Sequence, residues 1–199
     1  MTKSEEKLGR FKDQLRAYFL RLAPDTPLAE LNELVEEFAY EVIPKKQMII
    51  QPDENSDMVY FICEGLVRIY TVKEEKEVTN WFIKENMAFA ATYSLITGEG
   101  NENFYEALER TEVMKIRYPV LESYYKKYHS IEHLGRKMIE AYYAMFMKRS
   151  NEVCFLSAEE RYHTFMEEHS DIMNRVSLRN VASYLGISQE TLSRLRAKH

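Results

Sequence analysis

The chain has 199 residues, of which 45% are hydrophobic and 30% charged, and its net charge is -5. This composition suits one large or two small globular domains and excludes a disordered chain. No apolar run approaches the roughly 18 residues of a membrane span, and the charged segment 1–10 lacks the apolar core of a secretory signal. The two cysteines, Cys63 and Cys154, favour a reducing cytoplasm over a disulfide framework.

The charge is unevenly distributed. Residues 171–199 contain five basic and two acidic residues, a net +3, which leaves -8 for the rest of the chain. A basic end on an acidic body is consistent with contact to phosphate, although a short basic patch is more often only a solvated face.

Two helices are predicted at the start of the chain. Apolar residues recur at helical spacing over residues 8–22 and again over 28–38. Asp25 or Thr26 is expected to cap the second helix, with Pro27 near its first position.

Short apolar runs separated by polar turns follow from residue 39 to Pro119 and predict an antiparallel β-sandwich or barrel. The clearest runs are 47–50, 58–63, 66–72, 78–83 and 113–116. We therefore expect an α+β chain whose first domain, residues 1–120, contains the N-terminal helices and a jelly-roll of strands.

A long helix is expected within residues 121–156, since no proline interrupts 131–156. An a/d stripe of apolar residues predicts that this helix pairs with a second copy of the chain. The alternative is a helix that packs only on its own domain. The stripe consists of Ile131, Leu134, Met138, Ala141 and Met145.

A helix-turn-helix is predicted in the C-terminal domain, residues 157–199. Ser157 and Glu160 match a capping box at the start of this domain. Ser177 is expected to cap a helix with Leu178, Val181, Ala182 and Leu185 on its apolar face, and Gly186 follows where a left-handed residue ends a helix. Ser188 is expected to cap the second helix, with Leu192 and Leu195 facing inward.

The second helix carries side chains suited to base edges. Arginine can bind guanine through two hydrogen bonds, glutamine suits adenine and glutamate accepts from cytosine, which makes Arg194, Glu190 and Gln189 the candidates for base contacts. The alternative is a plain helical hairpin with a charged face. The remaining exposed candidates at this DNA-binding surface are Ser177, Arg179, Ser188, Thr191, Ser193 and Arg196.

The segment 188–194, Ser-Gln-Glu-Thr-Leu-Ser-Arg, resembles the recognition helix of the Crp/Fnr family of bacterial transcription regulators, commonly Ser-Arg-Glu-Thr-Val-Gly-Arg. The resemblance implies base contacts at Glu190 and Arg194 and a phosphate contact at Thr191. Gln189 departs from the family pattern, so a different preferred DNA sequence is expected. The resemblance also implies a cyclic nucleotide-binding-like roll, a dimerisation helix, a homodimer on near-palindromic DNA and contact with RNA polymerase. Family members continue into a wing beyond this helix, whereas the sequence given ends at His199, so weaker contact to the DNA backbone is expected.

The same resemblance places the effector site near residues 89–107. Family members that bind cyclic AMP carry an arginine for its phosphate there, and residues 89–109 contain none. Since a buried phosphodiester needs a cation or several N–H donors, we expect little binding of cyclic AMP. Aromatic and polar residues could instead line a site for an unidentified, less anionic effector, or could simply form the core of the roll. They are Trp81, Phe89, Ala91, Thr92, Tyr93, Asn103, Phe104 and Tyr105.

Other functions are less well supported. None of the five histidines lies in the roll, which argues against a metal enzyme of the cupin type, and two cysteines cannot ligate an iron–sulfur cluster. No catalytic motif is present, so the chain is not expected to be an enzyme. A ligand-binding or protein-interaction module with a vestigial helix-turn-helix remains the alternative to a DNA-binding regulator.

Overall fold

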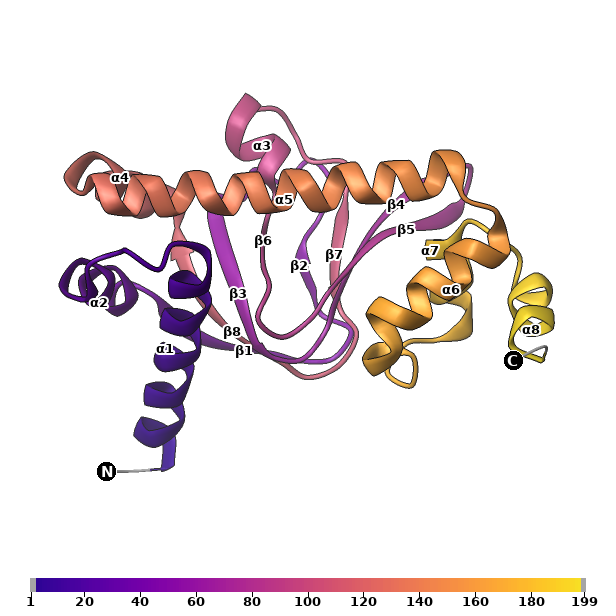
Figure 1. Cartoon of the computed structure of the whole chain (residues 1–199), viewed down its shortest axis with the longest axis horizontal. Helices are drawn as coiled ribbons and strands as arrows, with labels where there is room; N and C mark the ends of the chain where they lie inside the picture. The colour runs from indigo at the N-terminus through magenta and orange to yellow at the C-terminus, as the bar shows by residue number, and fades with distance from the viewer. Residues whose placement is uncertain (1–2, 198–199) are drawn as a thin grey trace.

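A β-roll of two four-stranded antiparallel sheets occupies the middle of the chain (Figure 1). The computed structural model describes residues 3–197, so the ends of the charged N-terminal segment and of the basic tail, residues 1–2 and 198–199, lie outside the described residues. The first sheet has the order β1 (Ala39–Ile43), β8 (Thr111–Arg117), β3 (Met58–Glu64) and β6 (Ala88–Ala90). The second has the order β2 (Met48–Ile50), β7 (Phe104–Ala107), β4 (Val67–Lys73) and β5 (Lys76–Ile83).

The five runs singled out in the sequence correspond to β2, β3, β4, β5 and β8. The alternation of side chains along these strands directs one row into the space between the sheets. There Tyr60 stacks on Phe89 with 4.9 Å between ring centroids, and Phe89 stacks on Tyr105 at 5.8 Å. The interior of the roll therefore contains a stack of aromatic side chains from both sheets, packed among aliphatic residues. The short helix α3 (Thr92–Thr97) follows β6 outside the sandwich.

Helices cover the outer face of the first sheet. Phe11 and Leu15 of α1 (Lys3–Leu22) are fully buried, as is Leu31 of α2 (Leu28–Glu36). They share one core with Phe61 and Met114 of the sheet and with α4 (Tyr118–Lys127). The predicted cap of α2 is wrong. Pro27 stands at the N-cap with no side-chain bond, while the Thr26 hydroxyl donates to the carbonyl of Ala23 at 2.9 Å.

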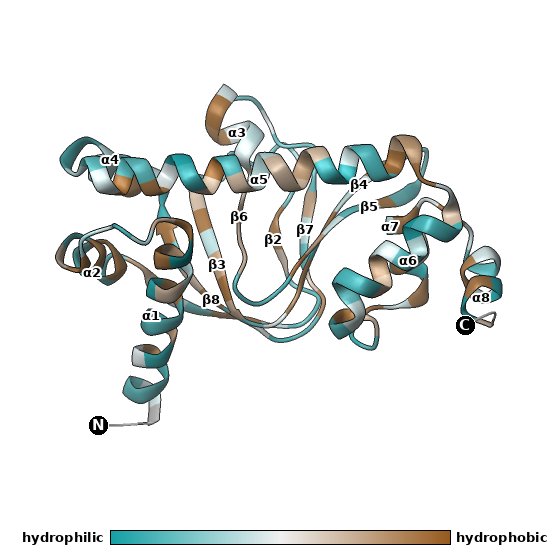
Figure 2. Ribbon diagram, viewed as in Figure 1, coloured by the Kyte–Doolittle hydropathy of each residue, from teal (hydrophilic) through white to brown (hydrophobic). Residues whose placement is uncertain are grey.

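The long helix α5 (His129–Phe155) runs along most of the length of the molecule, and Figure 2 shows hydrophobic residues recurring up to its C-terminal end. Its last residues lead into α6 (Ala158–His169), the 3₁₀ turn η1 (Ser170–Ile172), α7 (Leu178–Leu185) and α8 (Gln189–Ala197). The predicted capping box at Ser157 and Glu160 is confirmed. Among residues 3–197, no helix is long and apolar enough to cross a bilayer.

Candidate DNA interface

The predicted helix-turn-helix is present as α7, a tight turn and α8. The hydroxyl of Ser177 accepts the N–H of Asn180 at 3.2 Å, which caps α7. Gly186 adopts the left-handed conformation at φ 66°, and the Ile187 N–H returns to the Ala182 carbonyl at 3.0 Å. The hydroxyl of Ser188 accepts the N–H of Thr191 at 3.1 Å at the start of α8. These local bonds fix the angle at which α8 leaves the turn.

Buried apolar side chains hold the two helices together. Val181 and Leu192 are fully buried, and Ala182 lets the helices approach closely because its side chain is small. Leu178 departs from the prediction. Its side chain is 36% exposed, because the first residue of α7 lies beyond the edge of this core.

The predicted DNA-contacting side chains lie on the solvent side of α7 and α8. All nine are exposed except Thr191, which is half-buried where its hydroxyl meets that of Ser188 at 3.2 Å. The Arg194 guanidinium lies back along α8, with its Nε 3.4 Å from the Glu190 carbonyl and its Nη2 3.4 Å from the Thr191 hydroxyl. Both are long, weak contacts that an incoming base can replace.

The side chain of Glu190 is an exposed hydrogen-bond acceptor. A hydrogen bond from Ser188 lowers the pKa of its carboxyl, and the neighbouring backbone and Arg194 act in the same direction. The carboxylate is therefore ionised at neutral pH, the form that accepts from the amino group of cytosine. The row formed by Gln189, Glu190, Ser193 and Arg194 is thus exposed and polar on a helix whose opposite side is buried.

The predicted stripe on α5 needs a correction. Ile131 and Leu134 are at most 2% exposed and pack in the core against the first sheet, so they cannot contact a second chain. Met138 packs against the same core and Ala141 is half-buried, whereas Met145 is 37% exposed.

The outward stripe lies one to two residues further along the chain than predicted. The Tyr142 hydroxyl donates to the Ala88 carbonyl at 2.7 Å and accepts the Ala88 N–H at 2.9 Å, which turns that face of α5 toward β6. The next stripe then faces solvent at steps of four and three residues. Its apolar members, each 56–64% exposed, are Ile139, Tyr143, Phe146 and Val153, with Ser150 completing the spacing.

The eight residues suggested for an effector site do not gather in one place. Phe89, Ala91 and Tyr105 are buried in the core of the roll, with Trp81 partly buried against them. Tyr93 is 56% exposed on α3, beside the exposed Thr92. Two further side chains lie near β7: Phe104 stacks on Tyr70 at 5.0 Å, and Asn103 accepts from Asn80 at 2.8 Å.

The buried arginine of the roll is already paired. Arg68 is 3% exposed, donates to Glu77 at 2.7 Å and to Thr79 at 2.8 Å, and lies over the ring of Tyr70. Its charge is therefore compensated by protein groups.

Sequence reasoning missed two residues of the C-terminal domain, Ser183 and Arg175. Ser183 lies inside the apolar pattern of α7, and Arg175 was counted only as a charge. Their partners in the roll are separated from them by 66 to 106 residues of chain, so no local spacing could reveal them.

Comparison with known proteins agrees with this architecture. Residues 40–128 match the family described as the cyclic nucleotide-binding domain. The chain is 30% identical over 105 residues to the global nitrogen regulator of Synechocystis, a match that covers 50% of this chain and 46% of that protein. The chain thus matches less than half the length of that relative.

Longer matches cover most of the chain. The fumarate and nitrate reduction regulatory protein of Vibrio cholerae is 23% identical over 188 residues, which cover 86% of this chain and 72% of the relative. The structure of FixK2 from Bradyrhizobium japonicum superposes with a TM-score of 0.71 and 21% identity over 81% of this chain and 83% of its own, which shows the shared fold. The chain therefore contains a match to the cyclic nucleotide-binding domain and is similar in sequence and fold to transcription regulators of the Crp/Fnr type.

Proposed function

We propose that the chain is a sequence-specific DNA-binding protein that acts as a homodimer and regulates transcription, and that it is not an enzyme. The observation that carries this proposal is the exposure on α8 of a row of side chains that can bind base edges. The caps at Ser177 and Ser188 and a buried core fix the direction of this helix. Arg194, Glu190 and Gln189 contact bases. The phosphate contacts come from Ser177, Arg179, Ser188, Thr191 and Arg196, which position the helix in the major groove.

The second chain pairs along the outward stripe of α5. Four large apolar side chains at a/d spacing exceed what a solvent-facing helix normally exposes, and their spacing fits a partner helix in a coiled coil. A two-fold axis along α5 places two copies of α8 on one side of the dimer. Two recognition helices about 34 Å apart would enter successive major grooves of a near-palindromic site.

Cyclic AMP is not the expected effector of this dimer. The aromatic stack of Tyr60, Phe89 and Tyr105 fills the middle of the roll, and the carboxylates of Glu99 and Glu102 belong to the segment that would face the phosphate. An effector of this roll would be a less anionic molecule. Contact with RNA polymerase is part of the proposed regulation.

The experiment is selection from a random pool of duplex DNA with the purified protein. We expect enrichment of a two-fold symmetric site whose half-sites are about one helical turn apart. Arg117→Ala is the matched control for Arg194→Ala. It also removes one positive charge, but Arg117 lies in the roll, where it pairs with Asp57 at 2.6 Å. If the wild-type protein enriches no symmetric site, with or without added cyclic AMP, the proposed function is wrong.

A further inference from the structure

The helix α7 has a second contact surface, which faces the roll. It lies against β5, the edge strand of the second sheet. The Ser183 hydroxyl accepts the Thr79 N–H at 2.9 Å and donates to the Glu77 carbonyl at 2.9 Å. One side chain of the helix-turn-helix thus pairs two backbone groups that an edge strand leaves open.

A shared hydrophobic core extends this contact. Phe82 of β5 packs against Tyr184 of α7 at 5.3 Å and against Phe165 of α6 at 6.4 Å. Leu66 of the roll is fully buried in the same cluster. On the other side, the Arg149 guanidinium of α5 lies 3.7 Å from the centre of the Tyr184 ring and donates to the Tyr184 carbonyl. The helix-turn-helix is therefore held between α5 and the roll.

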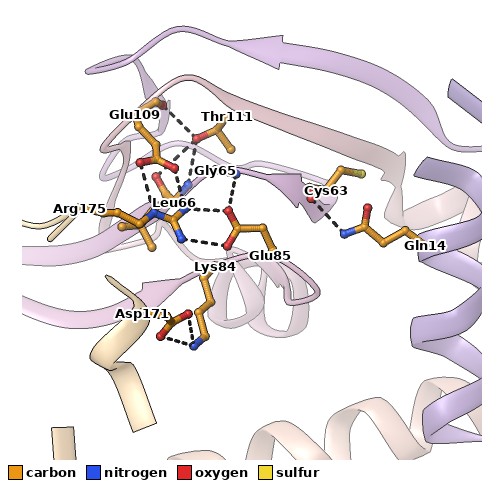
Figure 3. Close-up of polar contacts among 10 residues, drawn as sticks. All are labelled: Gln14, Cys63, Gly65, Leu66, Lys84, Glu85, Glu109, Thr111, Asp171 and Arg175. Carbon is orange, nitrogen blue, oxygen red and sulfur yellow. Dashed lines mark hydrogen bonds and ion pairs between the residues drawn. The ribbon is translucent and has the colours of Figure 1, made fainter. Parts of the chain in front are cut away.

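A clamp of opposite charges closes the end of this interface (Figure 3). Arg175, two residues before the α7 cap, donates to both oxygens of Glu85 at 2.7 and 3.1 Å and to both oxygens of Glu109 at 2.6 and 3.4 Å. The two carboxylates come from different turns of the roll, β5–β6 and β7–β8. The Gly65 N–H donates to Glu85 at 2.9 Å and fixes that carboxylate from behind.

The clamp is stronger than a surface ion pair. All three side chains are only 25–33% exposed, and a guanidinium that binds two carboxylates has a defined orientation. Burial opposes ionisation of Glu85, but the hydrogen bonds from Arg175 and Gly65 outweigh it and lower its pKa. Next to the clamp, Lys84 binds Asp171 at 2.7 Å (Figure 3). The turn that precedes α7 is thus tied to the roll at two adjacent points.

None of these groups occupies the proposed DNA-binding surface, because Arg179 and the base-contacting row of α8 remain exposed. We propose that Arg175 is a positioning residue that fixes the helix-turn-helix on the roll in the orientation with which both α8 helices of the dimer engage a palindromic site. This inference rests on the proposed function. If the clamp only positions the domain, its loss weakens binding to a full site with two half-sites more than binding to a single half-site. This is because, once the first domain has bound, the second binds well only if it is already correctly placed.

The first test needs no DNA. Hydrogen exchange of the Thr79 amide measures whether α7 stays on the β5 edge, because that amide donates to Ser183. We expect Arg175→Ala to accelerate this exchange by about tenfold, whereas Arg117→Ala should leave it unchanged. In Arg175→Ala, the amides of the β3–β8 ladder should exchange at the wild-type rate. Unchanged Thr79 exchange in Arg175→Ala would overturn the inference. Glu109→Gln, which preserves size, provides a milder variant should Arg175→Ala fold poorly.

The second test compares a full palindrome with a single half-site from the same selected sequence. We expect Arg175→Ala to weaken full-site binding about tenfold more than half-site binding, because only the full site needs both domains in register. Equal loss at both sites would mark Arg175 as an ordinary phosphate contact, and a gain in full-site affinity would mark the clamp as inhibitory. Either result overturns the inference.

A double-mutant cycle with Glu109→Ala separates the clamp from the charge of Arg175. The loss in the full-to-half-site ratio should be no larger in the double variant than in Arg175→Ala alone. Fully multiplicative losses would contradict a shared clamp. If the wild-type protein binds no DNA, the proposed function fails and the positioning role fails with it. The exchange experiment then shows separately whether the clamp itself holds α7 on the roll.

Discussion

Substitution of Phe146 by alanine tests the proposed dimer most directly. Phe146 lies in the middle of the outward stripe of α5 and is 57% exposed in the single chain. Full burial of such a side chain stabilises by about 1.5–3 kcal/mol, so a partner helix can gain about 1–1.5 kcal/mol from the exposed part. The two-fold dimer contains two copies, which gives about 2–3 kcal/mol and a dimer that is roughly 30- to 150-fold weaker.

Sedimentation equilibrium across a range of protein concentrations measures this change. Phe155→Ala is the matched control, because Phe155 is 80% exposed on the same helix but lies two residues beyond the last member of the stripe. We expect its dimer dissociation constant to stay close to that of the wild type. The reasoning is refuted if Phe146→Ala dimerises as well as the wild type, or if both variants lose affinity equally. The helix would then pack only on its own domain or pair through another face.

Three further predictions concern DNA recognition, the turn and pH. Arg194→Ala should lose about 1–3 kcal/mol of binding and relax specificity at one base pair in competition assays, whereas a uniform loss over all sequences would mark a phosphate contact. Gly186→Ala should lower the free energy of unfolding in urea by roughly 1–2 kcal/mol, because φ at this position is +66°. The added Cβ would meet only Arg161 at 4.0 Å, so a much larger loss would contradict this explanation. Burial, reinforced by the charge of Lys84, lowers the pKa of His169 below its usual 6.5. As the pH falls, the histidine is therefore protonated in the unfolded chain before it is protonated in the folded one, and the free energy of unfolding should fall as the pH drops through about 6.5. His169→Phe should flatten that part of the pH dependence of urea unfolding, and an unchanged slope would exclude His169 as its source.

Local signals predicted the helix-turn-helix well. Ser177 and Gly186 act through bonds to residues within four positions, so the sequence contains most of the information that forms the turn. The outward stripe on α5 was harder to predict from the sequence. Tyr142 and Tyr143 can each continue an apolar stripe at helical spacing, and only the hydrogen bonds of Tyr142 to β6 decide which of them faces the roll.

Long-range contacts were beyond prediction. Arg175 and Glu85 are 90 residues apart in the chain, and neither belongs to a motif. The strands β6 and β7 have three and four residues, which is too short for a period-two pattern to emerge. The suggested effector residues were chosen as one segment of the chain, but successive side chains of a strand point to opposite faces, which separates Phe104 from Tyr105.

The contact between Ser183 and the β5 edge limits how the protein can be divided. A fragment that ends before α6 would leave the Thr79 N–H and the Glu77 carbonyl unpaired, and would uncover Phe82 and Leu66 beside them. An open strand edge next to an apolar patch favours pairing between molecules and aggregation. The roll is therefore not an interchangeable sensor module that can be fused to another output domain. Any such chimera must carry along a helix that covers this edge.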